Sequence, residues 1–410
     1  MKPDYDVVIV GGGYAGQAAA VSLARAGLGS HVLVVDRRGR AGYPPTSTSG
    51  IASYWLDKLG FPPAPDAIAS PIRSFRLVVS GDPPGTERIL SQGNPLAREL
   101  GVVLQEKEFL GRLETESTKA GVTFRHLTHA ENAVRHGDWY YTNLRMDGRQ
   151  TTVTSSWILD AGGYDSRISR RFGITKELPP EDRHNGLEVS VPNIGQHPPD
   201  RVTLYLGAWA PSGYAWVFPS SEGGQPYLRV GIGTPLSVRD DHGVPIPVKK
   251  YFDRFMHDFP EFDLPAHHRM GGVIPTSFPR RILHRLRVLA LGDAARLTDG
   301  LTGGGIHQAL ASGVAAAGAV HADTPGLYER KLSPFIHEMR LRYRWKQVLL
   351  GMTEDELRST LDALVEMDLP PGRFSPYTMR REALRHLRQR GVRPLRVLLR
   401  SHRFWKAALT

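Results

Sequence analysis

A glycine-rich turn near the N-terminus constrains the fold of this chain more than any other feature. The apolar residues 6–10 read as a strand, GGGYAG follows at 11–16, a helix is predicted over 15–26, and a second strand, HVLVVD, ends at Asp36. A G-x-G-x-x-G pattern between a strand and a helix, with an acid after the next strand, is typical of a β-α-β unit that binds a dinucleotide.

Each position of this pattern has a physical role. Gly11 permits the tight turn, Gly13 lets the backbone approach a pyrophosphate, and Gly16 allows the helix to pack closely on the strand. The helix N-terminus offers free N–H groups and a partial positive charge to the phosphates. Asp36 is placed to accept hydrogen bonds from ribose hydroxyls.

A second glycine cluster lies near the other end of the sequence. The strand RVLALGD ends at Asp293, and TGGGI at 302–306 opens a helix rich in small residues. The Asp293 carboxylate would hold the ribityl chain of FAD, and the positive end of the helix would stabilise the negative charge of a reduced isoalloxazine ring. The two clusters therefore predict sites for the two ends of one FAD molecule. The predicted cofactor-binding residues are Gly11, Gly13, Tyr14, Ala15, Gly16, Asp36, Arg37, Leu104, Gly292, Asp293, Gly303, Gly304, Gly305 and Ile306.

Between the glycine clusters, the sequence predicts an antiparallel meander. Three β-rich segments, 202–210, 213–219 and 227–233, are separated by turn residues. Tyr214, Trp216 and Phe218 alternate along the middle segment, so their rings point to one face of the sheet. Such a row makes an apolar wall suited to a long hydrocarbon or a planar ring, although any sheet packs its core in the same way.

The motifs YDVVIVGGGYAG, PSGYAWVFPSSEGG and LALGDAARLTDGLTGGGIHQALASG together resemble those of the geranylgeranyl reductase family, FAD-dependent oxidoreductases of the para-hydroxybenzoate hydroxylase superfamily. The resemblance implies that the chain saturates prenyl double bonds, with a hydride from reduced FAD and a proton from a donor or water. It implies a substrate pocket formed by Tyr214, Trp216 and Phe218, with Ser47, Tyr214 and Trp216 as catalytic residues. The implied partner is a lipophilic small-molecule substrate, and NAD(P)H and reduced ferredoxin both stay open as electron donors.

Four positions depart from the family pattern. Ser47 stands where the family has a proposed catalytic cysteine, and a serine forms no thiolate at ordinary pH. Gly162-Gly163 replaces the usual Asp-Gly, Glu106 replaces an Arg, and Asp299-Gly300 replaces Asp-Pro. Because the main contacts to FAD come from the backbone, cofactor binding is expected to survive. A different unsaturated, apolar substrate becomes credible.

These features predict an α/β (α+β composite) architecture. A Rossmann-like FAD-binding domain is expected over 1–175 and 270–325, with part of 76–94 inserted, and an antiparallel-sheet substrate domain over 176–269. A C-terminal helical region is expected over 326–410. Within it, Thr353 and Glu356 form a predicted capping box that opens an amphipathic helix over 352–367.

Composition narrows the classes of function. The chain has no cysteine, which excludes disulfides, thiolate catalysis and Cys-ligated metals. No metal site is predicted, since the pair His267-His268 lacks a third ligand at metal spacing and reads as a surface loop. The sequence has no apolar run long enough to span a membrane and no signal peptide, so a cytoplasmic location is expected.

The positive charge is concentrated at the C-terminus. Residues 372–410 carry eleven Lys and Arg against Glu382 alone, in a chain whose net charge is +11. One interpretation is a basic amphipathic helix pair that contacts the inner membrane face peripherally, and the other is a solvated helical end packed on its own domain. No zinc-ligand spacing or aromatic-basic platform predicts binding to nucleic acid.

Three functions are open on the sequence alone. The favoured one is a flavin-dependent reductase of an isoprenoid or similar lipophilic alkene. The second is an FAD-dependent monooxygenase or halogenase-type enzyme on a specialised-metabolism substrate. Oxygen consumption coupled to NAD(P)H oxidation would favour it. The third is a non-enzymatic FAD-binding scaffold on a membrane, which would keep its flavin and bind liposomes without turnover.

Overall fold

One of the two large sheets that organise the molecule carries the predicted dinucleotide unit. The computed structural model describes residues 2–83, 85–91 and 99–366. Its eight-stranded sheet has the parallel core β18-β11-β1-β2-β8. Strand β17 pairs antiparallel at the β18 edge, and the antiparallel pair β10-β9 branches from β11. The strands are β1 (Tyr5–Val10), β2 (Val32–Val35), β8 (Thr123–Arg125), β9 (Thr128–His136), β10 (Trp139–Met146), β11 (Arg149–Asp160), β17 (His284–Arg285) and β18 (Val288–Ala290). The β-α-β unit predicted from the first glycine cluster is confirmed.

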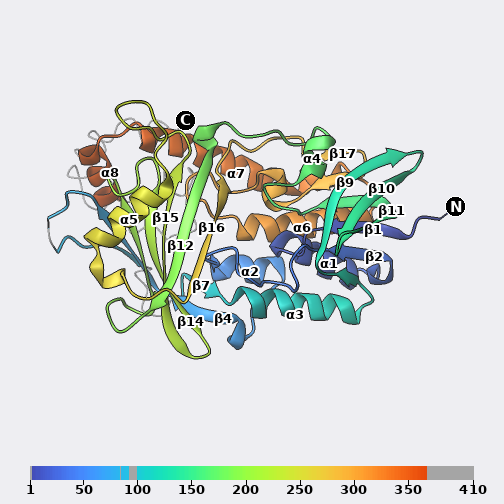
Figure 1. Cartoon of the computed structure of the whole chain (residues 1–410), viewed down its shortest axis with the longest axis horizontal. Helices are drawn as coiled ribbons and strands as arrows, with labels where there is room; N and C mark the ends of the chain where they lie inside the picture. Colours follow the sequence, from blue (N-terminus) through green and yellow to red (C-terminus); the bar gives the residue numbers. More distant parts are fainter. Residues whose placement is uncertain (1, 84, 92–98, 367–410) are drawn as a thin grey trace, which may run out of the picture.

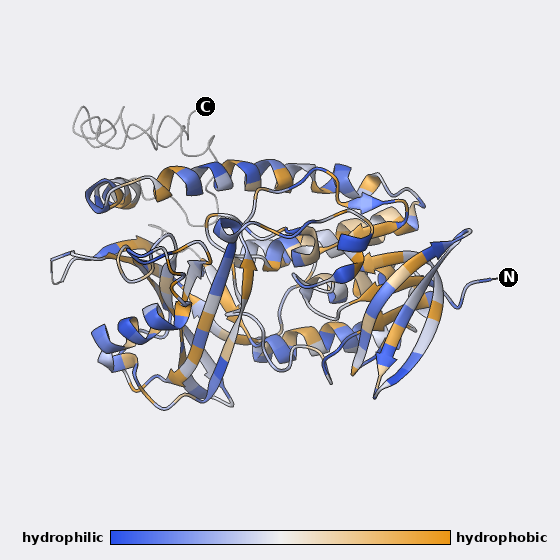
Figure 2. Ribbon diagram, turned by 45° about the horizontal axis from the view of Figure 1, so that its top comes forward, coloured by the Kyte–Doolittle hydropathy of each residue, from blue (hydrophilic) through white to orange (hydrophobic). Residues whose placement is uncertain are grey.

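Helices cover the parallel sheet and bury its apolar strands. Helix α1 (Tyr14–Arg25) and helix α6 (Ile306–His321) lie side by side (Figure 1). A Cβ on Gly313 would lie 2.5 Å from the carbonyl oxygen of Ala15, so only a glycine lets the two helices pack this closely. Helix α3 (Glu106–Lys119) packs on the other side of α1. Figure 2 shows apolar segments along the sheet strands, and the buried cluster there joins residues of the parallel strands with residues of α1 and α6.

The second large sheet has seven strands in the order β16-β12-β15-β14-β13-β5-β6. They are β5 (Ser74–Val79), β6 (Arg88–Ser91), β12 (Arg183–Pro192), β13 (Arg201–Leu206), β14 (Tyr214–Glu222), β15 (Gln225–Pro235) and β16 (His268–Pro275). The predicted meander is confirmed as β13-β14-β15. Helix α5 (Val248–Asp258) covers one face, where Phe255 packs with Val217 and Ile232.

This sheet is larger than the predicted substrate domain and not wholly antiparallel. It takes in β16, which runs past the expected boundary at residue 269, and β5 and β6 from the predicted insertion. Strands β5 and β13 pair in parallel, whereas the other neighbours pair antiparallel. The expected range was too narrow because β5 and β16 are distant in sequence from the meander that they extend.

A small sheet joins the two large sheets, and two short helices lie beside it and beside the parallel sheet. Strands β3 (Gly50–Ile51), β7 (Gly101–Leu104) and β4 (Ile68–Ile72) form a three-stranded sheet. Helix α2 (Ser53–Leu59) follows β3, and helix α4 (Arg167–Arg171) follows β11. The β3–β7–β4 sheet packs against β14, so the loop before β3 lies close to the seven-stranded sheet.

The described part of the C-terminal region is helical, as predicted. Helix α7 (Leu327–Leu350) runs along both sheets, and helix α8 (Glu354–Glu366) packs on β5 and β6 (Figure 1). The capping box is confirmed, since the Thr353 N–H donates to Glu356 Oε2 at 2.9 Å and the Glu356 N–H to Thr353 Oγ1 at 3.2 Å. Among the described residues, no helix is both long and apolar enough to cross a bilayer. The basic segment 372–410 lies outside the described residues.

Candidate functional site

The two glycine clusters, distant in sequence, meet in the fold. A Cβ on Gly292 would lie 3.2 Å from the Cβ of Ala15, in the first turn of α1. The Gly292 N–H donates to Ser312 Oγ of α6 at 3.0 Å, which holds the end of β18 against that helix. Close packing of α1 on α6 therefore brings both predicted cofactor loops to the same edge of the parallel sheet.

The N-terminal loop has the shape of a phosphate cradle. Gly11 has a φ of +96°, and a Cβ on Gly16 would lie 1.8 Å from the Gly11 carbonyl oxygen, so neither position tolerates a side chain. Gly13 caps α1 without any side-chain hydrogen bond, so Tyr14 and Ala15 begin the helix with free N–H groups. Asp36 accepts from the Gly12 N–H at 2.6 Å. These residues fit the diphosphate half of FAD.

Arg38, which the sequence did not single out, joins this loop. The predicted residue Arg37 is exposed. Arg38 donates to Asp36 Oδ2 at 3.2 Å, and its guanidinium would lie 3.9 Å from a Cβ on Gly13. Arg38 therefore lies beside the glycine pattern, and a contact of Arg37 with the cofactor stays a prediction.

Glu106 ties this arginine to the loop before β3. It lies at the start of α3, two residues after the buried Leu104 of β7, and Arg38 Nη1 is 3.6 Å from its Oε1. Its carboxylate accepts from the Thr46 N–H at 3.0 Å and the Thr46 hydroxyl at 3.1 Å. Burial raises the pKa of Glu106, and the hydrogen bonds from Thr46 oppose that rise. Where an Arg was expected, the chain has an acid that anchors residues 46–49.

The second glycine loop also fits a ligand that needs backbone donors. Gly305 caps α6 without a side-chain hydrogen bond, so the N–H groups that begin at Ile306 are left for a ligand. Gly303 has a φ of +67°, and Gly304 follows it in the loop. Asp293 accepts from Thr298 Oγ1 at 2.7 Å, and burial raises its pKa. This arrangement matches the predicted site for the ring end of FAD.

A buried ion pair from α7 supports this second loop. Asp299 accepts from the Leu301 and Thr302 N–H groups at 2.8 and 3.0 Å, and Arg342 Nη1 donates to its other oxygen at 3.0 Å. A Cβ on Gly300 would lie 3.4 Å from the Cα of Tyr343. Glycine in place of the family's proline thus accompanies the close approach of α7.

The aromatic row of β14 faces the same loop. Tyr214, Trp216 and Phe218 share a sheet face, opposite the Ala215 and Val217 that pack on α5. The Tyr214 hydroxyl donates to the carbonyl of Thr302. The rings of Tyr214 and Trp216 lie 5.7 Å apart. The rings of Tyr214 and Trp216 therefore form an aromatic wall beside the second glycine loop, which is called the ring-end loop below.

The third ring points elsewhere along that face. A Cβ on Gly50 would lie 2.8 Å from Phe218, which packs with Ile72, Val103 and Val202 between the small sheet and the large one. Phe218 is therefore joined to the structural core between the sheets, and its predicted place in the substrate pocket stays a prediction.

Ser47 lies where the family has its cysteine, but its neighbours make the contacts to the wall. The Ser47 Oγ accepts from the Ser49 N–H at 3.0 Å, and its carbonyl accepts from Arg229 of β15 at 2.9 Å. Thr48, the next residue, donates its hydroxyl to Glu188 of β12. Glu188 also accepts from Trp216 Nε1 at 2.7 Å. Neither Thr48 nor Glu188 was predicted, and a lone acid between apolar strand residues was the only signal.

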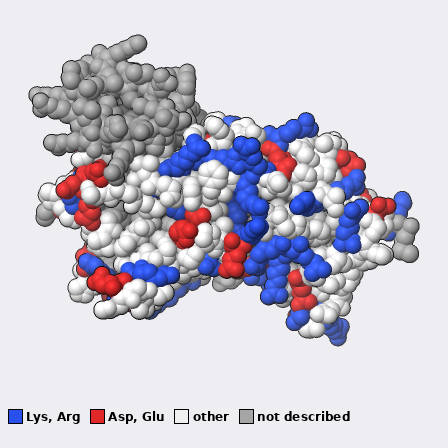
Figure 3. Space-filling view, turned by 90° about the horizontal axis from the view of Figure 1, so that it is seen from above, with Lys and Arg blue, Asp and Glu red and all other residues white. Residues whose placement is uncertain are grey.

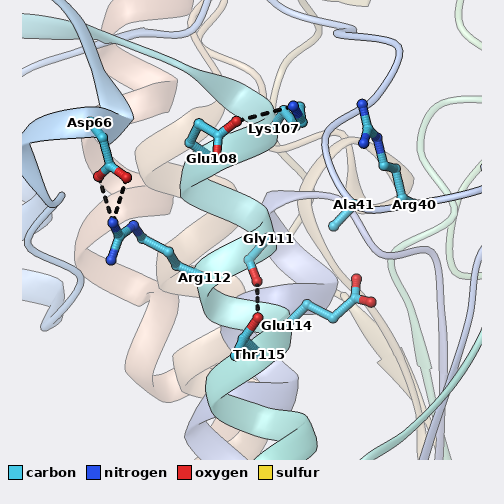
Figure 4. Close-up of a pocket in the computed structure, with 9 residues that line it drawn as sticks. All are labelled: Arg40, Ala41, Asp66, Lys107, Glu108, Gly111, Arg112, Glu114 and Thr115. Carbon is cyan, nitrogen blue, oxygen red and sulfur yellow. Dashed lines mark hydrogen bonds and ion pairs between the residues drawn. The ribbon is translucent and has the colours of Figure 1, made fainter.

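A surface pocket lies apart from this site. It is formed by the solvent-facing side of α3 and neighbouring loops, where Arg112 pairs with Asp66 (Figure 4). None of the predicted site residues lines it. Within the described residues, no group of His, Asp and Glu is arranged to hold a metal ion.

Two uncapped helix N-termini that meet at one sheet edge, each with an acid beside it, define a flavin-binding oxidoreductase. The chain belongs to the FAD binding domain family, which matches residues 4–319, and within it to the geranylgeranyl reductase family. It is 30% identical over 379 residues to a digeranylgeranylglycerophospholipid reductase of Methanothermobacter thermautotrophicus, covering 89% of this chain and 93% of that one.

Two solved structures share its fold. A geranylgeranyl bacteriochlorophyll reductase-like protein from Thermoplasma acidophilum aligns with a TM-score of 0.81 and 24% identity over 97% of this chain and 99% of that one. The p-nitrophenol 4-monooxygenase of Pseudomonas putida aligns with a TM-score of 0.66 and 15% identity over 99% of each. The fold is therefore common to reductases and oxygenases, and the fold alone does not separate them.

Proposed function

We propose that this flavoenzyme reduces carbon–carbon double bonds of an isoprenoid or other lipophilic alkene. The observation that carries the proposal is the contact between the Tyr214 hydroxyl and the Thr302 carbonyl, which joins the aromatic wall to the ring-end glycine loop. A substrate held on this wall lies beside the place where the flavin ring is expected. The reductase names of the relatives support the same chemistry.

The sheet face that carries the wall suits contact with a hydrocarbon chain. Gly186 pairs with Gly233 across β12 and β15, and Gly231 pairs with Glu188, on the face that carries Tyr214 and Trp216. The Trp216 indole lies over Gly231 and Gly233, and Ile274 lies over Gly186, so apolar side chains lie flat on this strip. A flexible polyprenyl chain fits such a surface, because it offers contact area without polar groups that would need partners.

The protein's own contribution is to bind and orient the alkene and to exclude water from it. Bound reduced FAD supplies the hydride. An unactivated alkene is a poor hydride acceptor, so the chain must hold it at a fixed position in a dry site. Tyr214 and Trp216 provide an apolar surface for this, and the Ser47 hydroxyl is too weak an acid to act as the family's thiol would.

The electron donor and the membrane contact are further parts of the proposal. The sequence has no second G-x-G-x-x-G pattern, so NAD(P)H docks transiently or reduced ferredoxin delivers the electrons. Lys and Arg also gather on the face seen from above (Figure 3). Burial and the charges of Arg281 and Arg344 lower the pKa of Arg340, so these three arginines lie near one another. Together with the basic segment 372–410, this face would suit peripheral contact with an anionic bilayer.

An anaerobic reoxidation experiment tests the proposal. FAD-loaded protein is reduced with dithionite and mixed with geranylgeranyl diphosphate. The proposal predicts reoxidation of the flavin and a product heavier by one H₂ for each double bond reduced. Flavin that stays reduced until oxygen is admitted, with substrate then gaining oxygen, would establish the monooxygenase alternative that the shared fold allows.

A further inference from the structure

Glu188 is a buried carboxyl in the seven-stranded sheet. It is 6% exposed and lies in β12, where it pairs with Gly231, which in turn pairs with Trp216 of β14. A Cβ on Gly231 would lie 2.4 Å from the indole. Glycine at this position therefore lets the Trp216 ring lie across β15 and reach Glu188.

The hydrogen bonds to Glu188 are those of an acid held in one orientation. The Thr48 hydroxyl and Trp216 Nε1 both donate to Oε2, the latter at 2.7 Å. No hydrogen bond to Oε1 and no ion pair within 4.0 Å is found among the described residues. Because Oε2 is occupied as an acceptor, a proton on the carboxyl resides on Oε1.

Burial, rather than the surrounding charges, favours the protonated form of Glu188. Burial raises its pKa, and Glu106 of α3 adds to the rise. Arg229 of β15 opposes it, together with the hydrogen bonds from Thr48 and Trp216. Arg229 is directed to the Ser47 carbonyl, however, and forms no ion pair with Glu188. An acid with donors and a cation nearby, but without a partner charge, can both hold a proton and release it.

Other buried acids near the site are committed to structural bonds. Glu106 holds Thr46 and Arg38, and Asp299 holds two backbone N–H groups and Arg342. The Tyr214 hydroxyl donates to a carbonyl, and burial raises its pKa further. Among the described residues, Glu188 is the one carboxyl that is hydrogen-bonded to the aromatic wall.

We propose that Glu188 is the acid that protonates the alkene during reduction, which rests on the function proposed above. As a hydride adds to one alkene carbon, the π electron pair forms a C–H bond at the other carbon with the proton of Glu188, whose O–H bond breaks. The alkene gains two electrons, the flavin loses them, and Glu188 becomes a carboxylate. Thr48, Trp216 and Arg229 stabilise that carboxylate until water returns the proton.

The test compares Glu188→Gln with wild type in the FAD-loaded protein. The amide still accepts from Thr48 and Trp216 but has no acidic proton. Reoxidation of the reduced flavin by geranylgeranyl diphosphate is expected to slow by a factor of about 100 or more, the usual contribution of a general acid. FAD affinity, flavin spectrum and dithionite reduction are expected to stay unchanged. The control is Glu329→Gln on α7, where the partly buried acid pairs with His284 of β17, and it should match wild type.

Two further readouts separate proton donation from a structural role. The first is the rate of flavin reoxidation, which in wild type should fall as pH rises through the pKa of Glu188. Glu188→Asp should keep that pH dependence at a lower rate, and Glu188→Gln should lose it. In addition, an acid whose folded pKa is raised loses stability as pH rises above its ordinary value of 4.5. Glu188→Gln should therefore show a smaller loss of unfolding free energy with rising pH than wild type.

The outcomes are distinguishable from failure of the proposed function. If wild type reoxidises and Glu188→Gln does so at the same rate, Glu188 is not the acid. If wild type itself is not reoxidised, reduction of this alkene fails, and the pH dependence of stability still decides whether Glu188 is held neutral. An identical pH dependence in both proteins would overturn the proposal.

Discussion

The two glycine loops serve the same cofactor but are built differently. The N-terminal loop is shaped mainly within one β-α-β unit, by Gly11, Gly16 and Asp36, and the Ala161 carbonyl after β11 also lies against Gly11. The ring-end loop is held from distant elements, by Arg342 on α7 and Tyr214 on β14. The first loop is therefore a property of a motif, and the second is a property of the whole fold.

Because of this difference, β14 of the seven-stranded sheet and helix α7 both contact the ring-end loop directly. A displacement of α7 would shift Asp299 and Gly300, which it contacts. A displacement of the seven-stranded sheet would shift Thr302 through Tyr214. Within the described part of the chain, the hydrogen bonds of Asp36 and Arg38 at the diphosphate end reach neither β14 nor α7. Changes in the substrate domain should thus affect flavin chemistry more than flavin affinity.

The largest expected effect is at the N-terminal loop. Gly16→Val should weaken FAD binding by about 1,000-fold or more, because even a Cβ would lie 1.8 Å from the Gly11 carbonyl oxygen. Titration of apoprotein with FAD measures the affinity. Gly111→Ala in α3, where a Cβ would meet nothing within 4 Å, should bind as wild type does. Equal affinities for Gly16→Val and Gly111→Ala would show that the loop does not hold the cofactor.

The ring-end loop should instead respond to a change on α7. Arg342→Met leaves Asp299 buried without its partner, which costs about 3–5 kcal/mol of unfolding free energy when a buried pair is broken. Denaturant unfolding measures this. Arg25→Met breaks an exposed pair and should cost at most about 1 kcal/mol. Similar costs for the two variants would contradict the assigned role of the buried pair.

Acid should affect the ring end through His307, the second residue of α6. Its ring stacks on Trp55 at 5.0 Å, and burial lowers its pKa from 6.5 to about 4. The unfolded chain therefore binds a proton first, so stability falls with decreasing pH from 6.5 to about 4. The loss approaches about 1.4 kcal/mol per pH unit within that window.

A histidine variant checks this. His307→Phe keeps the stacking and removes the titrating group, so it should reduce the pH dependence of unfolding below pH 6.5. His184 and His197, whose pKa values burial lowers to about 3 and about 4, still contribute to the remaining dependence. An unchanged slope in His307→Phe would show that His307 is not held neutral.

The smallest expected effect concerns the wall itself. Gly231→Ala should displace the Trp216 indole and slow reoxidation by substrate about 10-fold, with FAD affinity unchanged. Gly326→Ala before α7, where a Cβ meets nothing within 4 Å, is the matched control. Stopped-flow absorbance under anaerobic conditions gives the rate. A parallel loss of FAD affinity would mean that wall and cofactor site are not separable.

The sequence predicted what depends on short spacings. The β-α-β unit, the meander, the alternation of Tyr214, Trp216 and Phe218, and the capping box at Thr353 all follow from local periodicity or fixed spacing. The pairing of two glycine loops into one site also followed, because each opens a helix after a strand.

The remaining contacts of the site could not be predicted, because no local sequence pattern indicates which distant residues meet. Arg38 rather than Arg37 reaches Asp36, since which of two adjacent arginines turns inward depends on the position of Glu106. The link from Thr48 to Glu188 joins residues 140 positions apart. Such contacts follow from how the two sheets meet.

A structure of the protein with bound oxidised FAD tests the division of labour between the two loops most directly. The diphosphate should lie on the backbone of Gly11–Gly16, and the isoalloxazine ring should lie at Gly303–Gly305 with one face towards Tyr214 and Trp216. A ring that lies away from this wall, or a diphosphate held elsewhere than at the N-terminus of α1, would contradict both the assignment of the loops and the proposed site of alkene reduction.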